Sequence, residues 1–315
     1  MVEDILIRKV LIFGVIILFL GMSVNISTSY LVKHNPTSIL DDNWYFLPGY
    51  PNYAPSGLPD FNQRQQYDWT YNGRWTFCGP TALANVLWWF DSKNANPNGS
   101  PGDGEDTCSL VIDYHAPGSP NPGPHSDDLN FNNVNDLQSP NQGNNAGELI
   151  ERLAWYVNCN NYRNTLIPHM GTNGLGMWWG AKKWIRDAGL HKHYRVQLRF
   201  RPSFFEINNR LRKNQGILLP LYYYSPGTGE ITYRHWVAVA GINSEGYIAF
   251  SDPFWDIENI RDPIEYNDAS IVSHDIWEIS LITPSPLAKW WLPSYPPYSE
   301  NGALVIWVII ISEKG

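Results

Sequence analysis

Residues 75–90 read WTFCGPTALANVLWWF, and this stretch has the marks of a helix start. Pro80 suits the first turn of a helix, where its missing N–H is not needed. Apolar side chains then recur at the i, i+4 and i+7 spacing of a buried helical face, at Leu83, Leu87 and Phe90. We therefore predict a helix over 80–90 that begins just after Cys78.

Downstream of this helix, two blocks of pattern follow. Helical periodicity returns at 147–157, 175–188 and 203–213. Strand patterns occupy the rest, at 217–224, 232–242, 247–251, 276–282 and 304–311. The short turn between the second and third of these strands predicts a hairpin. Helices first and antiparallel strands later predict an α+β domain.

Cys78 has the position of a nucleophile. The unpaired N–H groups and the dipole at a helix start favour the thiolate over the thiol. Gly79 lets the backbone approach a substrate closely, and the N–H of Cys78 can donate to a developing oxyanion. The competing interpretation is an inert buried cysteine, which is the commoner fate of a free thiol.

His235 is the predicted base. It opens the apolar run 236–241, so a strand can hold it rigidly while it still faces a cleft. The alternative is a half-buried histidine whose hydrogen bonds are satisfied. The sequence contains no HExxH spacing, which disfavours a zinc hydrolase. We predict neither a metal nor a cofactor.

Asp252 is the predicted orienting carboxylate. It ends the strand expected to pair with the His235 strand, so hairpin pairing brings the two side chains within reach. A carboxylate there can accept the second N–H of the imidazole. Asp256, in the same turn, is the weaker choice, and an Asp that only forms the turn before Pro253 is the structural alternative.

Three segments, in this order, resemble the C39-like branch of papain-like cysteine peptidases. They are CGPTALAN at 78–85, HWVAVAG at 235–241 and SDP at 251–253. The resemblance covers about 60–255, apart from an insertion. It implies a papain-like fold, with a helical N-terminal part that carries the nucleophile at a helix start and an antiparallel sheet in the C-terminal part.

The resemblance also implies the site and the activity. Cys78, His235 and Asp252 match the family triad. The family places a Gln upstream of the Cys as an oxyanion donor. Gln65 is the expected match, although its spacing needs a short insertion at 67–77, and Gln63 and Gln66 stay open. The implied protein is an exported thiol hydrolase that cleaves peptide or amide bonds in peptides or proteins. A catalytically inactive surface-binding module and a transglutaminase-type acyltransferase are the alternatives.

The N-terminus predicts export. Arg8 and Lys9 precede an apolar run at 10–20, which is followed by small and polar residues. This is the layout of a cleaved secretory signal at 1–29. An uncleaved anchor that attaches the protein to the membrane and a buried helix are the alternatives. We expect an extracytoplasmic protein, secreted or anchored at the cell surface.

The rest of the chain divides into an extended lead-in at 30–59 and one domain at 60–315. Residues 92–146 within it are rich in Asn, Gly, Pro, Ser and Asp, which indicates a loop-rich insertion. Asp103, Glu105 and Asp106 in the insertion match no calcium loop, so we expect a solvated acidic loop.

The composition narrows the partners. The net charge of −8 is dispersed and there is no basic stripe, which disfavours nucleic acid. The 15 Trp favour a core of large rings over a carbohydrate-binding surface. The three cysteines leave at least one unpaired, and a bridge between Cys108 and Cys159 would keep Cys78 free.

Overall fold

A computed structural model of the chain describes residues 43–50, 57–61, 63, 70–94, 110–111, 149–163, 169–225, 227–254, 275–295 and 302–314. The expected N-terminal signal, most of the lead-in and nearly all of the insertion lie outside these ranges. Within them, no helix is long and apolar enough to cross a membrane.

Most of the described helices come before most of the strands in the sequence. They are α2 (Cys78–Asn94), α4 (Leu149–Tyr156), α5 (Gly174–Asp187), α6 (Phe204–Leu211) and the 3-10 turn η2 (Cys159–Asn161). The strands are β1 (Trp44–Phe46), β2 (Thr70–Tyr71), β3 (Arg74–Trp75), β4 (Tyr194–Phe200), β5 (Gly216–Tyr224), β6 (Ile231–Asn243), β7 (Tyr247–Ser251), β8 (Asp275–Glu278), β9 (Trp291–Leu292), β10 (Gly302–Val305) and β11 (Trp307–Glu313).

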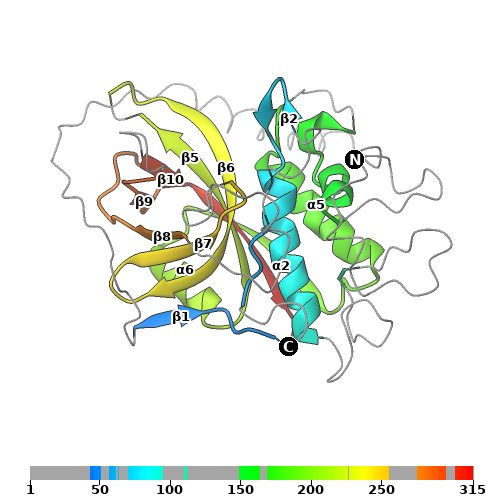
Figure 1. Cartoon of the computed structure of the whole chain (residues 1–315). Coiled ribbons are helices and arrows are strands. Elements are labelled where there is room, and N and C mark those ends of the chain that lie inside the picture. The colour runs from blue at the N-terminus through cyan, green and yellow to red at the C-terminus, as the bar shows by residue number, and fades with distance from the viewer. Residues whose placement is uncertain are drawn as a thin grey trace, which may run out of the picture.

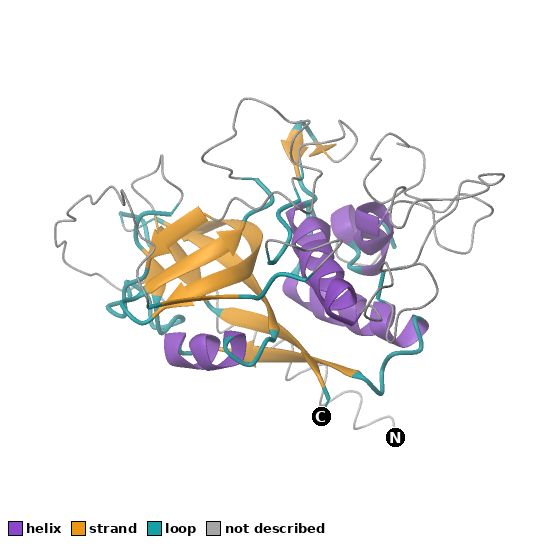
Figure 2. Ribbon diagram, turned by 60° about the horizontal axis from the view of Figure 1, so that its bottom comes forward, coloured by secondary structure: helices purple, strands orange, loops and turns teal. Residues whose placement is uncertain are grey.

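Nine strands form one antiparallel sheet, whose main path runs β4-β11-β5-β6-β7-β8. Strands β1, β9 and β10 attach beside this path, and β2 and β3 form a separate ribbon. Helices α2, α4 and α5 gather on one side of the molecule and the curved sheet on the other, while α6 packs against β5 and β6 apart from them (Figures 1 and 2). The α+β class predicted from the sequence is therefore confirmed.

Helix α2 lies at the centre of the fold. It starts at Cys78, two residues before the predicted start at Pro80, runs to Asn94, and is buried on all sides from Cys78 to Ser92. The prediction of a single buried stripe at Leu83, Leu87 and Phe90 is therefore too narrow, because the other faces of the helix are buried as well. The helix packs against β5 and β6 on one side and α4 on the other, so it has no solvent face over most of its length.

The other predicted helices are confirmed, with ends set by capping. The side chain of Asn173 accepts a hydrogen bond from Gly176 N and starts α5. The Ser203 side chain accepts one from Glu206 N and starts α6. Helix α4 occupies Leu149–Tyr156 within the predicted 147–157 segment.

The predicted hairpin is also confirmed, because β6 and β7 pair in antiparallel register. The segment predicted as one strand over 304–311 is instead two strands, β10 and β11, which break at Ile306. The break faces Pro220, since β11 pairs with β5 up to Leu218 and β10 pairs with it from Leu221. A proline has no N–H for a sheet ladder, which explains the interruption.

The predicted lead-in supplies part of the sheet. Strand β1 pairs with the end of β6, and Phe46 lies over Gly241, where a Cβ would stand 2.3 Å from its ring. Leu47 and Leu58 are buried in the main core. The core therefore reaches into the 30–59 segment.

Candidate active site

Cys78 is the first residue of α2 and its side chain is only 5% exposed. The next residue, Gly79, determines how closely the loop at 169–173 approaches the start of α2. A Cβ on Gly79 would stand 2.6 Å from Thr172 Cβ, which is closer than real contacts allow. The glycine therefore lets the loop at 169–173 press against the start of the helix.

His235 and Asp252 meet across the β6–β7 hairpin. The register pairs Ala238 with Ser251, so Asp252 follows the end of β7 on the side where His235 lies in β6. His235 Nε2 is 2.6 Å from Asp252 Oδ1, and both side chains are buried. This contact leaves Nδ1 as the ring nitrogen for another partner.

The Cys78 side chain also interacts with the His235 ring. Burial works against the charged imidazolium of His235, but the charge of Asp252, its hydrogen bond, and a smaller contribution from the Cys78 side chain outweigh it. Together they raise the pKa of His235 to about 10. The three side chains that the sequence predicts for one site therefore interact in series: Cys78 with His235, and His235 with Asp252.

Tyr295 completes the surroundings of Asp252, and the sequence analysis did not find it. Its hydroxyl donates to Asp252 Oδ2 at 2.6 Å, while the backbone N–H of Phe254 donates to Oδ1 at 2.9 Å. The Tyr295 ring is fully buried and lies nearly parallel to the His235 ring, with centroids 6.5 Å apart. Burial, followed by the charge of Asp252, raises the pKa of Tyr295 well above its ordinary value, so it stays a neutral donor.

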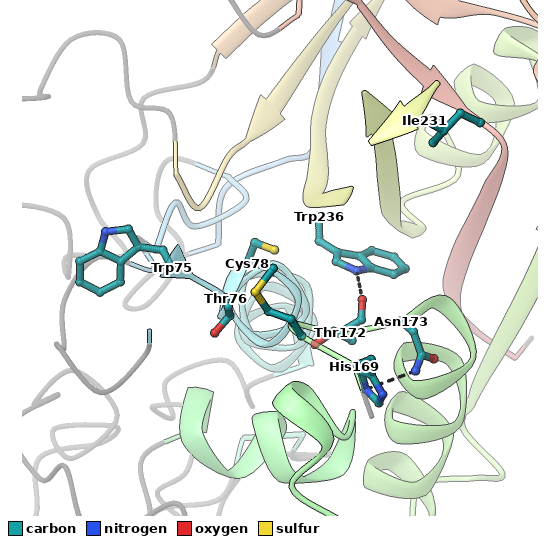
Figure 3. Close-up of a pocket in the computed structure, with 10 residues that line it drawn as sticks. Trp75, Thr76, Cys78, His169, Thr172, Asn173, Ile231 and Trp236 are labelled. Atoms are coloured by element: carbon teal, nitrogen blue, oxygen red, sulfur yellow. Dashed lines mark hydrogen bonds between the residues drawn. The ribbon is translucent and has the colours of Figure 1, made fainter. Parts of the chain in front are cut away.

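A pocket of about 310 Å³ opens beside Cys78. In Figure 3 the start of α2 is seen nearly end-on, with Cys78 between Trp75 and Trp236. The loop at 169–173 forms another wall. Trp236 Nε1 donates to Thr172 O at 2.8 Å, so the strand that carries His235 is tied directly to this loop.

A turn with left-handed backbone holds the loop in place. Asn158, Asn160 and Asn161 all have positive φ, a conformation that Asn tolerates better than most residues. The Asn160 side chain donates to Thr76 Oγ1 at 2.9 Å and accepts from Gly171 N at 2.8 Å. It therefore bridges the segment before Cys78 and the pocket loop.

Of the three upstream glutamines that the sequence offers as oxyanion donors, the structure describes Gln63. Gln63 is buried, its N–H donates to Pro253 O at 2.8 Å, and its side-chain Oε1 has no hydrogen-bond partner. It thus lies next to the segment that carries Asp252. Gln65, the expected oxyanion donor, lies outside the described residues, as do Gln66 and the alternative carboxylate Asp256.

The bridge from Cys159 that the cysteine count allowed as a hypothesis is not present. Cys159 is a free thiol, fully buried, with its Sγ 3.4 Å from Thr76 O. Burial raises its pKa, which makes it a poor nucleophile. Counting cysteines suggested a bridge to Cys108 only as a hypothesis, and in the structure Cys159 is part of the main core. Cys108 lies outside the described residues.

Among the described residues, no group of three or more His, Cys, Asp or Glu side chains is placed to hold a metal ion. Comparison with known proteins adds no assignment. No family model matches the chain, and no curated protein matches it. The site is therefore interpreted from its own geometry.

Proposed function

We propose that this protein is a thiol hydrolase that cleaves peptide or amide bonds, with Cys78 as nucleophile, His235 as base and Asp252 as orienting carboxylate. The observation that carries the proposal is the buried chain of contacts from Cys78 through His235 to Asp252. Nucleophile, base and orienter within reach of one another are the signature of covalent catalysis. A papain-like fold of the C39-like kind, and an exported or surface-anchored protein, belong to the same proposal.

The proposed cycle begins by forming the imidazolium. The proton of the Cys78 thiol passes to His235, whose pKa is raised to about 10, and the sulfur is then ready to attack. The thiolate attacks the carbonyl carbon, the C–S bond forms and the carbonyl oxygen becomes an oxyanion. The Cys78 N–H and an upstream glutamine donate to this oxyanion.

Collapse of this intermediate breaks the C–N bond, and His235 gives its proton to the leaving amine. A water then loses a proton to His235 and attacks the thioester. The carboxylic acid leaves, and the thiolate–imidazolium pair is restored. Among the upstream glutamines, Gln63 is buried and its backbone N–H donates to Pro253 O, next to the segment that carries Asp252. Gln65 stays the predicted oxyanion donor.

Replacing Cys78 tests this proposal directly. Wild type and Cys78→Ala are treated with a fluorescent iodoacetamide and assayed for hydrolysis of denatured casein. We expect both labelling at the site and hydrolysis to disappear in Cys78→Ala. Cys159→Ala is the matched control, because Cys159 is free but buried with a raised pKa, and it should keep both signals.

Two outcomes speak against the proposal. Hydrolysis retained by Cys78→Ala would remove Cys78 from the mechanism. Labelling of Cys78 without hydrolysis of any peptide or amide would favour a binding module. An amine-incorporation assay in parallel identifies transglutamination, because the same acyl-enzyme would then pass to an amine in place of water.

A further inference from the structure

The pocket beside Cys78 has mainly apolar walls. Trp75, Trp236, Met170 and Ile231 contribute large apolar surfaces to it. Met170 and Ile231 are 41% and 38% exposed, so they form its outer rim, whereas Trp236 is buried at 2%. Because Cys78 is part of the lining, a substrate side chain in the pocket lies next to the Cys78 side chain and therefore close to the bond that would be cleaved.

Most polar atoms in the walls already have partners within the protein, and the exception is the buried hydroxyl of Thr172, which has none. Trp236 Nε1 donates to Thr172 O, and Asn173 Oδ1 accepts from Gly176 N. His169 Nε2 is hydrogen-bonded to Asn158 O at 2.8 Å, and Thr76 Oγ1 accepts from Asn160. These groups build the wall and are not set up to recognise a polar ligand.

The absence of charged side chains in the lining also favours an uncharged ligand. None of the residues that line the pocket is Asp, Glu, Lys or Arg. A charged side chain that entered would lose water without gaining a partner of opposite charge, which is costly. The volume of about 310 Å³ exceeds the roughly 150 Å³ of an apolar cavity that holds benzene, so a large side chain fits.

We propose that this pocket is a specificity site that receives a large uncharged apolar side chain of the substrate, aromatic or long aliphatic, beside the bond that Cys78 attacks. The inference rests on the proposed function and adds the substrate class to it. Ile231 and Met170, on the rim, are the residues whose replacement should change the preference.

A peptide library with each residue varied in turn tests the preference. Wild type should favour Phe, Leu or Met over Lys and Glu by about ten- to hundredfold in kcat/KM at one position next to the cleaved bond. Ile231→Asp should lower this ratio at least about tenfold and raise cleavage with Lys at that position, because it places a carboxylate on the rim. The matched control is Ile282→Asp, since Ile282 is 87% exposed and lies outside the pocket lining.

A second readout needs no turnover. The rate of Cys78 alkylation by iodoacetamide is measured with added N-acetyl-phenylalaninamide or N-acetyl-lysinamide. The first should protect Cys78 at a concentration at least about tenfold lower, and Ile231→Asp should reverse the order. Absence of hydrolysis with this protection intact would overturn the proposed function alone. Equal protection by both amides, a charged residue preferred by wild type, or a preference unmoved by Ile231→Asp would overturn the pocket assignment.

Discussion

Asp252 has both carboxylate oxygens engaged. Oδ1 faces His235 and the N–H of Phe254, and Oδ2 accepts from Tyr295. A carboxylate fixed at both oxygens cannot rotate away, so it holds the imidazole in one tautomer and orientation. Tyr295 does not contact Cys78 in any described interaction, and it acts on the site as a positioning residue through Asp252.

The charge of Asp252 should set the alkaline limit of activity. His235 must carry its proton for the thiolate–imidazolium pair, so activity should persist as pH rises and fall through about pH 10, the raised pKa. In Asp252→Asn the charge and hydrogen bond of the carboxylate are gone, and only the smaller contribution of Cys78 opposes burial, so the pKa of His235 should fall well below about 10. We expect the alkaline limb of kcat/KM to move down by several pH units, measured from pH 5 to pH 10.5.

Tyr295→Phe is the comparison for this shift. It keeps the Asp252 charge and removes only the hydroxyl that donates to Oδ2, so the alkaline limb should stay near pH 10 while kcat falls about tenfold. An alkaline limb unmoved in Asp252→Asn would contradict the role of Asp252. A lower limb in Tyr295→Phe would mean that the hydroxyl acts on the protonation of His235 as well as on its position.

At the scale of elements, the start of α2 and the loop at 169–173 are built to touch. Gly79 allows the contact with Thr172, and the turn at 158–161 holds the loop from its other side through Asn160. Left-handed Asn residues store backbone strain, which clusters at functional sites. The element geometry thus sets the distance between Cys78 and the pocket wall.

Gly79→Ala should open this contact. The added Cβ would stand 2.6 Å from Thr172 Cβ, so the loop or the helix start must shift. We expect a loss of about 1–3 kcal/mol in the free energy of unfolding. We also expect kcat/KM to drop by about 10²-fold, because a small displacement misplaces the reacting groups. Thermal unfolding and steady-state kinetics measure the two effects.

Gly227→Ala is the control, because a Cβ there meets nothing within 4 Å. It should leave both quantities near wild type. Full activity in Gly79→Ala would show that the close approach of the loop is not needed by the site.

At the scale of the whole molecule, one buried asparagine joins three parts of the chain. Asn85 in α2 accepts from Phe61 N at 3.0 Å and donates to Ser251 Oγ at 2.7 Å. Ser251 Oγ in turn lies 2.6 Å from Pro59 O. Because Ser251 precedes Asp252, this network joins α2, which begins at Cys78, to β7, which leads into Asp252.

Asn85→Ala should therefore destabilise the whole fold. It leaves the buried Phe61 N–H without its acceptor and removes a donor to Ser251, so the free energy of unfolding should fall by about 2–4 kcal/mol in urea. The control is Asn209→Ala, at an exposed position of α6, which should change stability by less than about 0.5 kcal/mol. A wild-type midpoint in Asn85→Ala would mean that the parts are held by packing alone.

Local pattern predicted a large share of this fold. Most of α2, α5, α6 and the β6–β7 hairpin follow from helical periodicity, a first-turn proline and strand alternation, which depend on neighbours in sequence. The hairpin is short, so it also placed Asp252 near His235. The pattern failed at Ile306, because the interruption comes from Pro220 in a partner strand and leaves no mark in the apolar run itself.

The sequence by itself determined the helix that presents Cys78, the class of the fold and the pair of strands that carry His235 and Asp252. The tertiary structure decided the rest: the hydroxyl of Tyr295 on Asp252, the free thiol of Cys159 in the core, and the apolar pocket made by 75–78, 169–173 and β6. Tyr295 is 43 residues from Asp252, and nothing in its own neighbourhood shows that contact. Such contacts arise from how the helices pack on the sheet, because burial and hydrogen-bond satisfaction are met across the fold and not along the chain.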